Sequence, residues 1–177
     1  MTLSAYAVTT PAAAAAYIGE AAQDRADVME AVINAVSEGI ENYTGRRFVT
    51  REISAEPHDC EGLLLLDHYP VTAISGVMLD GRSVTDYTAD VKSGLLTRPG
   101  GFHGAALVTY TAGYAADAGS VPQDVQLAAW LWSAALLEAA RSQKSESLGD
   151  YSVTYTEAGP LPPQAAALLE PYRTKSV

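Results

Sequence analysis

Apolar side chains recur at helical spacing most strongly between Val121 and Arg141. Pro122 falls in the first turn of this stretch, Asp124 near its positive N-terminal end and Arg141 near its negative C-terminal end. Apolar residues occupy three faces and only a narrow stripe is polar, as is typical of a helix buried on most sides. The pattern predicts a helix over residues 121–142. Its apolar faces are covered either by neighbouring copies of the chain or by the core of one protomer.

Shorter helices are predicted on either side of this long one. Thr10 can cap a helix over residues 11–18, and Asp24 can cap a second helix over residues 25–43. A glycine follows each of these helices within two residues and can end it in a left-handed turn. A last short helix is expected over residues 164–169.

From Arg46 onward the spacing of apolar residues changes from helical to alternating, which predicts strands. Asp80-Gly81 is a hairpin signal, because glycine tolerates a positive φ. The polar stretch around His58 is interpreted as a loop between strands. These signals predict a small antiparallel sheet over residues 46–113. The predicted strands are 48–54, 63–66, 71–79, 84–89, 95–98 and 106–111.

The predicted fold class is therefore α+β and mainly α-helical. Helices stand at both ends, a small antiparallel β-sheet is inserted between the second helix and the long central helix, and an extended C-terminal arm follows. In that arm Tyr151, Val153 and Tyr155 alternate with polar residues. We expect a main domain of residues 1–144 and an arm of residues 145–177 with a short helix. The main domain holds helices 11–18, 25–43 and 121–142 and the β insertion 46–113.

Composition narrows the class of protein. The 177 residues suffice for one domain with a hydrophobic core. A formal net charge of -10 argues against a grip on nucleic acid but does not exclude a surface that DNA passes without binding. The single Cys60 excludes an internal disulfide. The sequence has neither an apolar run of bilayer-spanning length nor a secretion signal, so no membrane partner is expected.

Residue types suited to catalysis cluster at His58-Asp59-Cys60, with His68 and His103 elsewhere. A Cys–His nucleophile pair needs spatial adjacency and an orienting third group, and adjacent strand residues point to opposite faces. With His68 added, the cluster matches no established spacing of metal ligands. The sequence also lacks a glycine-rich phosphate loop and a Walker-type lysine. We therefore expect no catalytic residue, no cofactor and no metal.

The candidate functional residues are instead those of protein interfaces. Arg46-Arg47 is a local basic cluster. It has two interpretations: a contact with an acidic partner or with passing phosphate, or a favourable positive charge at the negative C-terminal end of the preceding helix. Tyrosine and tryptophan combine apolar area with a polar tip and suit interfaces. The predicted interface residues are Trp130, Trp132, Leu137, Tyr151, Val153, Tyr155, Arg46 and Arg47.

Five segments, taken in their order and spacing, carry a resemblance to a known family. The segments are Ile40–Phe48 (IENYTGRRF), Tyr69–Ile74 (YPVTAI) ahead of Asp80-Gly81, Val108–Tyr114 (VTYTAGY) ahead of Val121-Pro122, Ser147–Val153 (SLGDYSV) and Leu168–Arg173 (LLEPYR). Together they span nearly the whole chain and resemble the head-to-tail connector, or adaptor, proteins of long-tailed bacteriophages. The alanine-rich first helix and the apolar Trp130-Leu131-Trp132 depart from the family pattern.

The resemblance implies a non-enzymatic structural protein of the virion neck, at the capsid–tail junction, made in the bacterial host cytoplasm. It implies a ring of identical subunits, a dodecamer, docked beneath the portal protein. The other face of this ring would receive stopper or tail-completion proteins, and DNA would pass through the lumen without sequence-specific binding. An acidic chain, a long helix with surplus apolar faces and a tyrosine-bearing arm are consistent with that role.

Three alternatives stay open at this stage. The chain can be a stopper or tail-terminator subunit, although such proteins are usually β-rich. It can be a Cys–His hydrolase centred on Cys60. It can also be a small regulatory module with a ligand in the sheet, for which the sequence singles out no ligand.

Overall fold

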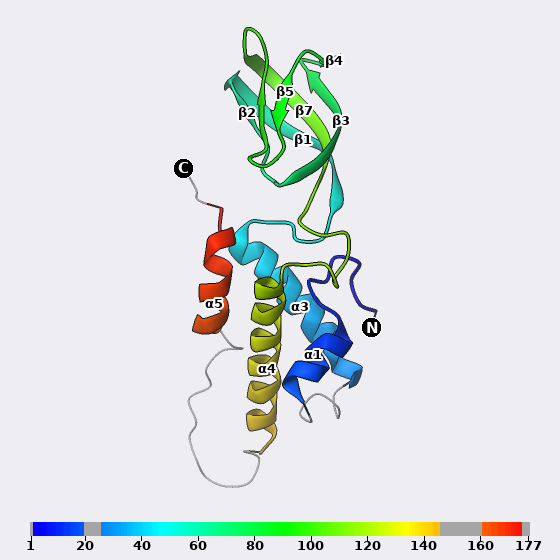
Figure 1. Cartoon of the computed structure of the whole chain (residues 1–177), viewed down its shortest axis with the longest axis vertical. Helices are drawn as coiled ribbons and strands as arrows, with labels where there is room; N and C mark the ends of the chain where they lie inside the picture. Colours follow the sequence, from blue (N-terminus) through cyan, green and yellow to red (C-terminus); the bar gives the residue numbers. More distant parts are fainter. Residues whose placement is uncertain (1, 20–25, 146–160, 175–177) are drawn as a thin grey trace. The chain divides into compact units, whose positions relative to one another are not determined.

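The computed structural model describes residues 2–19, 26–145 and 161–174. The chain folds into two compact units (Figure 1). The helical unit comprises Met1–Thr44 and Asp117–Val177, and the β unit comprises Gly45–Ala116. Among the described helices, none is long and apolar enough to cross a membrane.

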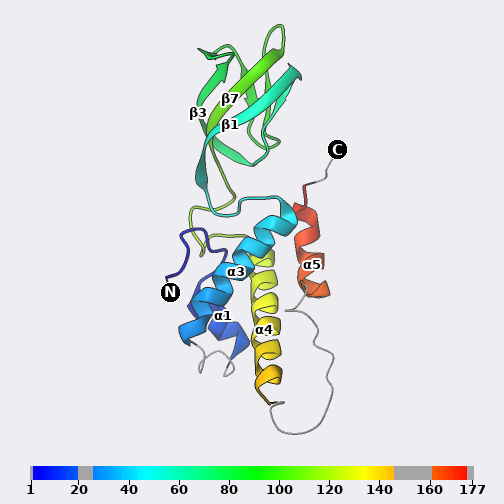
Figure 2. The ribbon, with the colours of Figure 1, turned by 180° about the vertical axis from the view of Figure 1, so that it is seen from behind.

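The helical unit is organised around the long helix α4. Its described elements are α1 (Pro11–Ile18), α3 (Ala26–Thr44), α4 (Gln123–Ser145), α5 (Pro163–Leu169) and the 3₁₀ helix η1 (Glu170–Tyr172). Helix α4 contacts α1, α3 and α5. Figures 1 and 2 show α5 along one side of α4 and α1 on the other. The core joins side chains from three helices with the N-terminal segment, namely Ala7, Ala14, Met29, Ile33 and Leu137.

The ends of α1 follow from local chemistry. The Thr10 side chain accepts a hydrogen bond from the backbone N–H of Ala13, and Pro11 occupies the first turn. Gly19 ends the helix with a φ of 76°. The helix bounds are those predicted from the sequence.

The β unit contains two antiparallel sheets. The first has the strand order β1-β7-β3-β4 and the second the order β2-β6-β5. Between the sheets lies a core of side chains that includes Leu64, Leu96, Phe102 and Tyr110, all fully buried. Burial of each of the large apolar ones contributes about 1.5–3 kcal/mol. The strands are β1 (Arg51–Gly62), β2 (Leu64–Leu65), β3 (Val71–Leu79), β4 (Arg82–Ser83), β5 (Thr88–Asp90), β6 (Leu95–Thr97) and β7 (Phe102–Ala112).

The prediction of a mainly α-helical fold is wrong. The described residues form four α-helices and seven strands in two sheets, and strand makes up a share comparable with helix. The prediction undercounted strand because β1 and β7 extend well beyond the segments in which alternation is visible. The interpretation of the His58 stretch as a loop is also wrong, since it lies within β1 and pairs with β7.

A bulge explains why the alternation seemed to end at Ser54. The register of β1 against β7 shifts between Ile53 and Glu56, and Ala55 has a φ of 50°. Before the bulge the less exposed side chains stand at odd positions such as Ile53, and after it they stand at even positions such as Glu56 and Cys60. The strand therefore continues while its sequence pattern changes phase.

Other predictions for the β region had mixed outcomes. The strand 71–79 is confirmed as β3, and Asp80 and Gly81 form the predicted hairpin turn with φ values of 48° and 75°. The strand 84–89 is largely wrong, because only its end lies in β5. The division into a main domain of residues 1–144 and an arm stays a prediction, and residues 146–160 lie outside the described part of the chain.

Candidate functional site

Three of the predicted interface residues lie on α4. Trp130 is partly exposed, and its indole N–H donates a hydrogen bond of 2.8 Å to the Thr9 hydroxyl. Its ring lies 5.3 Å from the ring of Tyr17, which is 48% exposed. Leu137 is buried in the helical core, in the same cluster against which Trp130 packs. The structure therefore brings Trp130 and Leu137 together.

Trp132 lies against helix α3 at a glycine. A Cβ atom added at Gly39 would lie 2.5 Å from Cη2 of Trp132, so the indole occupies the space that any other residue at position 39 would need. The Trp132 indole nitrogen is buried, and no described residue accepts a hydrogen bond from it. The packing of Trp132 therefore depends on a glycine at position 39 of α3.

One face of α4 keeps apolar residues partly exposed. Val125, Ala128 and Ser133 are fully buried. Leu127, Leu131 and Ala134, at helical spacing along another face, remain partly exposed although α1, α3 and α5 all contact this helix. We call these three residues the outer face of α4.

The basic pair Arg46-Arg47 lies in the β unit. Arg46 is 8% exposed, and its guanidinium carbon lies 3.5 Å from the centroid of the Tyr69 ring, a cation–π contact. Arg47 is partly exposed. Two aromatic rings follow at the same end of the unit, where Phe48 stacks on Tyr114 at 5.4 Å. Tyr151, Val153 and Tyr155 lie outside the described residues.

A buried polar network in the β unit was not predicted from the sequence. The Glu56 carboxylate on β1 accepts hydrogen bonds from the Tyr110 hydroxyl at 2.6 Å and from the backbone N–H of Asp67 at 3.1 Å. The His58 ring lies 2.7 Å from the same carboxylate. The Tyr110 hydroxyl also accepts from the backbone N–H of His68. The network therefore fastens the segment before β3 to strands β1 and β7.

The electrostatics of this network follow from burial and hydrogen bonding. Burial raises the pKa of Glu56, but the hydrogen bonds from His58, Tyr110 and Asp67 outweigh it and hold the pKa below its usual value. Burial and the bond to Glu56 raise the pKa of Tyr110. Burial lowers the pKa of His68, with Arg47 adding to the effect. Glu56 is therefore ionised and the other two groups neutral at pH 7.

Cys60, the centre of the hydrolase alternative, lies on the buried side of β1. It is 4% exposed, and burial together with the Asp59 charge raises its pKa. The thiol form is unreactive compared with the thiolate, so this environment is unsuited to a nucleophile. Within the described residues, no group of three or more His, Cys, Asp or Glu side chains could hold a metal ion.

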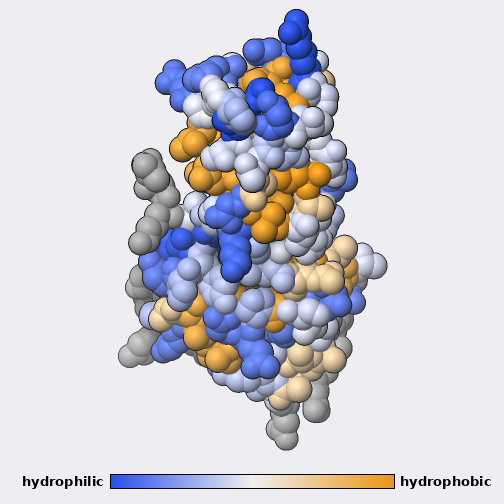
Figure 3. Space-filling view, turned by 45° about the horizontal axis from the view of Figure 1, so that its top comes forward, coloured by the Kyte–Doolittle hydropathy of each residue, from blue (hydrophilic) through white to orange (hydrophobic). Residues whose placement is uncertain are grey.

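Large apolar side chains reach the surface of the β unit, where Figure 3 shows orange residues among hydrophilic ones. Leu107 on β7 pairs in register with Met78 on β3 and with Pro57 on β1, so these three form a row on the outer side of the first sheet. On the second sheet Leu65 is 54% exposed, and the neighbouring Leu63 is 63% exposed. Such surfaces are typical of proteins that bind other proteins.

These features define a class of protein, namely an acidic structural chain whose candidate sites are protein-binding surfaces. Residues 7–175 match the family described as Head completion protein. The chain therefore belongs to the head completion protein family. This membership confirms the resemblance to head-to-tail connector proteins and the predicted location in the virion neck.

Solved structures share the fold of the chain. A chain described as "Neck of empty GTA particle computed with C6 symmetry" is 18% identical, with a TM-score of 0.63 over 100% of this chain and 95% of that one. One described as "Neck of native GTA particle computed with C12 symmetry" has a TM-score of 0.58 at 18% identity, covering 100% of this chain and 97% of its own. A third, from "Virion of native gene transfer agent (GTA) particle", is 18% identical, with a TM-score of 0.62 over 100% of this chain and 94% of that one. No curated protein matches the sequence.

Proposed function

We propose that the protein is the head-to-tail adaptor, a ring of identical subunits beneath the portal that joins the capsid to the tail-completion proteins. Membership of the head completion protein family is the observation that carries this proposal. The chains of similar fold come from particle necks computed with C6 and C12 symmetry, which supports a closed ring and is consistent with a dodecamer. A closed ring uses two different surfaces of each subunit, one facing each neighbour.

DNA passes through the lumen of this ring in the proposed role. The formal net charge of -10 per subunit supports a channel that does not hold DNA, because tight binding needs clustered cations that displace counterions. The function requires no chemistry, so the protein is not an enzyme. The raised pKa of Cys60 supports this view.

The proposed subunit contacts use the residues named from the sequence. Trp130 and Trp132 remain partly exposed on α4 beside its outer face, and they serve contacts between neighbouring copies. Leu137, which is buried, supports them from within the core. Arg47, which is partly exposed, serves a contact of the β unit with an acidic partner, and the buried Arg46 beside it supports this contact from within the unit. Tyr151, Val153 and Tyr155 serve the attachment of the arm to the portal.

The adaptor role is preferred to the stopper role because the chain has a helical unit in which α1, α3 and α5 pack against α4. A stopper subunit is expected to be dominated by strands. The two roles differ in their direct partner, since the adaptor binds the portal itself and the stopper binds to an adaptor ring already in place.

Deletion of the gene from a particle-producing genome tests the proposal. We expect DNA-filled heads without attached tails in electron micrographs, and normal particles when the gene is supplied in trans. Tailed, infectious particles without the protein would refute the neck function. Light scattering of the purified chain mixed with purified portal then separates the roles, because only the adaptor should add its mass to the portal ring.

A further inference from the structure

The first sheet of the β unit has one side packed on the core and one side exposed. Ile53 and Leu79 pack against the core, so the alternate side chains of their strands point outward. On the outward side Leu107, 43% exposed, lies in register between Met78, 41% exposed, and Pro57. This row crosses three strands and is therefore a continuous apolar surface. We call this side the outer face of the first sheet.

The charged side chains on this face are carboxylates. Asp59 and Glu61 occupy the outward positions of β1 that follow the apolar row. Glu52 points to the same side at the other end of β1, before the bulge. All three are exposed. His103, which pairs with Glu61, bonds through its ring Nε2 to the backbone carbonyl of Gly100 at 3.0 Å. The apolar row is therefore bordered by negative charge.

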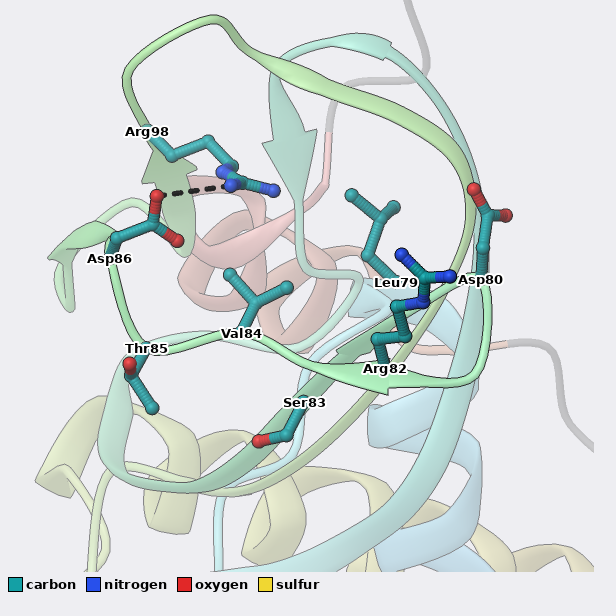
Figure 4. Close-up of a pocket in the computed structure, with 8 residues that line it drawn as sticks. All are labelled: Leu79, Asp80, Arg82, Ser83, Val84, Thr85, Asp86 and Arg98. Atoms are coloured by element: carbon teal, nitrogen blue, oxygen red, sulfur yellow. Dashed lines mark hydrogen bonds and ion pairs between the residues drawn. The ribbon is translucent and has the colours of Figure 1, made fainter.

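The cations of the β unit all lie away from this face. The unit is nearly balanced, with six Lys or Arg and eight Asp or Glu residues. Arg82 pairs in register with Leu79, so its side chain points to the same side as Leu79 and away from the apolar row. Figure 4 shows it with Arg98 at the pocket beside the β3–β4 hairpin, where Arg98 is paired with Asp86 at 3.0 Å. The other four precede β1, start it on its inward side or lie in the turn after β5, namely Arg46-Arg47, Arg51 and Lys92. The negative charge is thus a property of the face and not of the whole unit.

We propose that the outer face of the first sheet binds a segment of another protein in which a large apolar side chain is flanked by Lys or Arg. The apolar side chain covers Leu107 and Met78, whose flexible thioether adapts to the shape of a partner. The flanking cations pair with Asp59 and Glu61. This surface is additional to the portal and neighbour contacts proposed above, and its chemistry does not depend on them.

Other occupants fit the face less well. Its carboxylates repel the phosphates of DNA and of an anionic lipid surface. A second copy of the chain carries a formal net charge of -10, so two copies repel each other and offer few clustered cations. The apolar row is expected to supply most of the affinity, because exposed ion pairs contribute little, and the carboxylates are expected to supply orientation and salt dependence.

A synthetic peptide of alternating lysine and leucine serves as the probe for the isolated chain. The methyl signals of Met78 and Leu107 are followed by NMR during titration at constant ionic strength. We expect saturable shifts and about tenfold weaker binding by Leu107→Ser. Leu65→Ser, the same change at an exposed leucine of the second sheet, should bind as the unsubstituted chain does. No saturable shift, equal binding of a peptide with glutamate in place of lysine, or equal weakening by both variants would overturn the proposal.

The role of the carboxylates is tested by the salt dependence of peptide binding. Asp59→Asn combined with Glu61→Gln should remove most of this dependence, because exposed charges are screened by salt. Glu38→Gln combined with Asp67→Asn is the matched control, an equal change of charge at exposed positions outside the face. It should keep the salt dependence of the unsubstituted chain. The same loss in both double variants would overturn the assignment of the cations to this face.

The partner itself is identified in purified particles. The photoreactive residue p-benzoylphenylalanine replaces Leu107 or, as the control, Leu65, and the cross-linked segment is sequenced by mass spectrometry. We expect position 107 to capture another particle protein at an apolar residue flanked by Lys or Arg. An adduct with a second copy of the chain, a segment without these cations, the same segment captured equally at position 65, or no adduct in particles that contain the chain would overturn the proposal. Absence of the unsubstituted chain from particles would instead refute the adaptor function, and the peptide titration would then decide the binding surface alone.

Discussion

The Tyr110 hydroxyl donates a hydrogen bond of 2.6 Å to the carboxylate of Glu56, a residue 54 positions earlier in the chain. The same hydroxyl accepts from the backbone N–H of His68 at 3.1 Å. One buried oxygen thus joins β7, β1 and the segment before β3. The stability of the β unit therefore depends on the Tyr110 hydroxyl as well as on the apolar core.

Tyr110→Phe should therefore destabilise the β unit. The substitution keeps the ring but leaves a carboxylate oxygen and a backbone N–H without their partner, which costs about 1–3 kcal/mol. Urea unfolding measures the change in free energy. Tyr87→Phe is the control, because no described residue bonds to the Tyr87 hydroxyl, and we expect a change within about 0.5 kcal/mol. Equal stability of the two variants would show that the bond contributes nothing.

The stability of the β unit should fall on acidification. Folding lowers the pKa of Glu56 from its usual value of 4.5, so the Glu56 carboxylate binds a proton more readily in the unfolded chain than in the folded protein. The stabilisation is complete above about pH 4.5 and is lost as the pH falls through the lower, folded pKa. Urea unfolding over this range should show that Glu56→Gln is less stable at pH 7 and less dependent on pH. Glu61→Gln, exposed on the same strand, should follow the unsubstituted protein, and an unchanged pH dependence in Glu56→Gln would contradict the assignment.

Gly39→Ala should destabilise the helical unit, against the usual preference of a helix for alanine. Alanine in place of glycine ordinarily stabilises a helix by about 1 kcal/mol. Here the new Cβ would lie 2.5 Å from Cη2 and 2.9 Å from Cζ3 of Trp132, and overpacking of this kind costs about 1–3 kcal/mol. Thermal unfolding should give a lower midpoint for the variant. With Trp132→Leu as background, the same substitution should become neutral or stabilising, and a loss of equal size there would exclude the indole as the cause.

Features set by neighbouring residues could be predicted from the sequence. Thr10 and Gly19 bound α1 through hydrogen bonds and a left-handed turn that involve only adjacent residues. Asp80-Gly81 marked the β3–β4 hairpin in the same way, because a two-residue turn requires positive φ values that few residue types adopt.

Features set by distant residues could not be predicted. The bulge at Ala55 reverses which side chains of β1 face inward, and a polar residue such as Glu56 gives no sign that it is buried until Tyr110 is brought beside it. Strands of two or three residues, such as β2 and β4, are defined only by their pairing. For the interface residues of α4, the sequence indicated an apolar helix but not which faces α1, α3 and α5 cover.

Cys60 should react slowly with thiol reagents in the folded protein. It is 4% exposed, and its pKa is raised by burial and by the charge of Asp59, so little thiolate is present at pH 7. The rate of reaction with a disulfide reagent should rise steeply in urea as the β unit unfolds. Cys60→Ala should leave the number of copies per particle unchanged. Rapid modification of the native protein would contradict the buried placement and restore the hydrolase alternative.

The proposed portal attachment of the arm is best tested by substitution rather than by truncation. Helix α5 belongs to the helical unit, since Ala165 and Leu169 are fully buried and the Tyr172 hydroxyl donates to the carboxylate of Asp124 at 2.9 Å. Deletion of residues 145–177 would remove these contacts along with the arm, and loss of the buried Leu169 side chain alone costs about 2–5 kcal/mol.

Joint replacement of Tyr151, Val153 and Tyr155 by serine leaves α5 in place. We expect the thermal midpoint of the chain to stay unchanged and its binding to purified portal, measured by light scattering, to weaken at least tenfold, because the apolar area of the contact is removed. The matched control replaces the interleaved Ser152, Thr154 and Thr156 by alanine and should bind as the unsubstituted chain does. Equal binding by both triple variants would refute the arm as the portal contact. Weakened binding by the control alone would assign the contact to the polar positions instead.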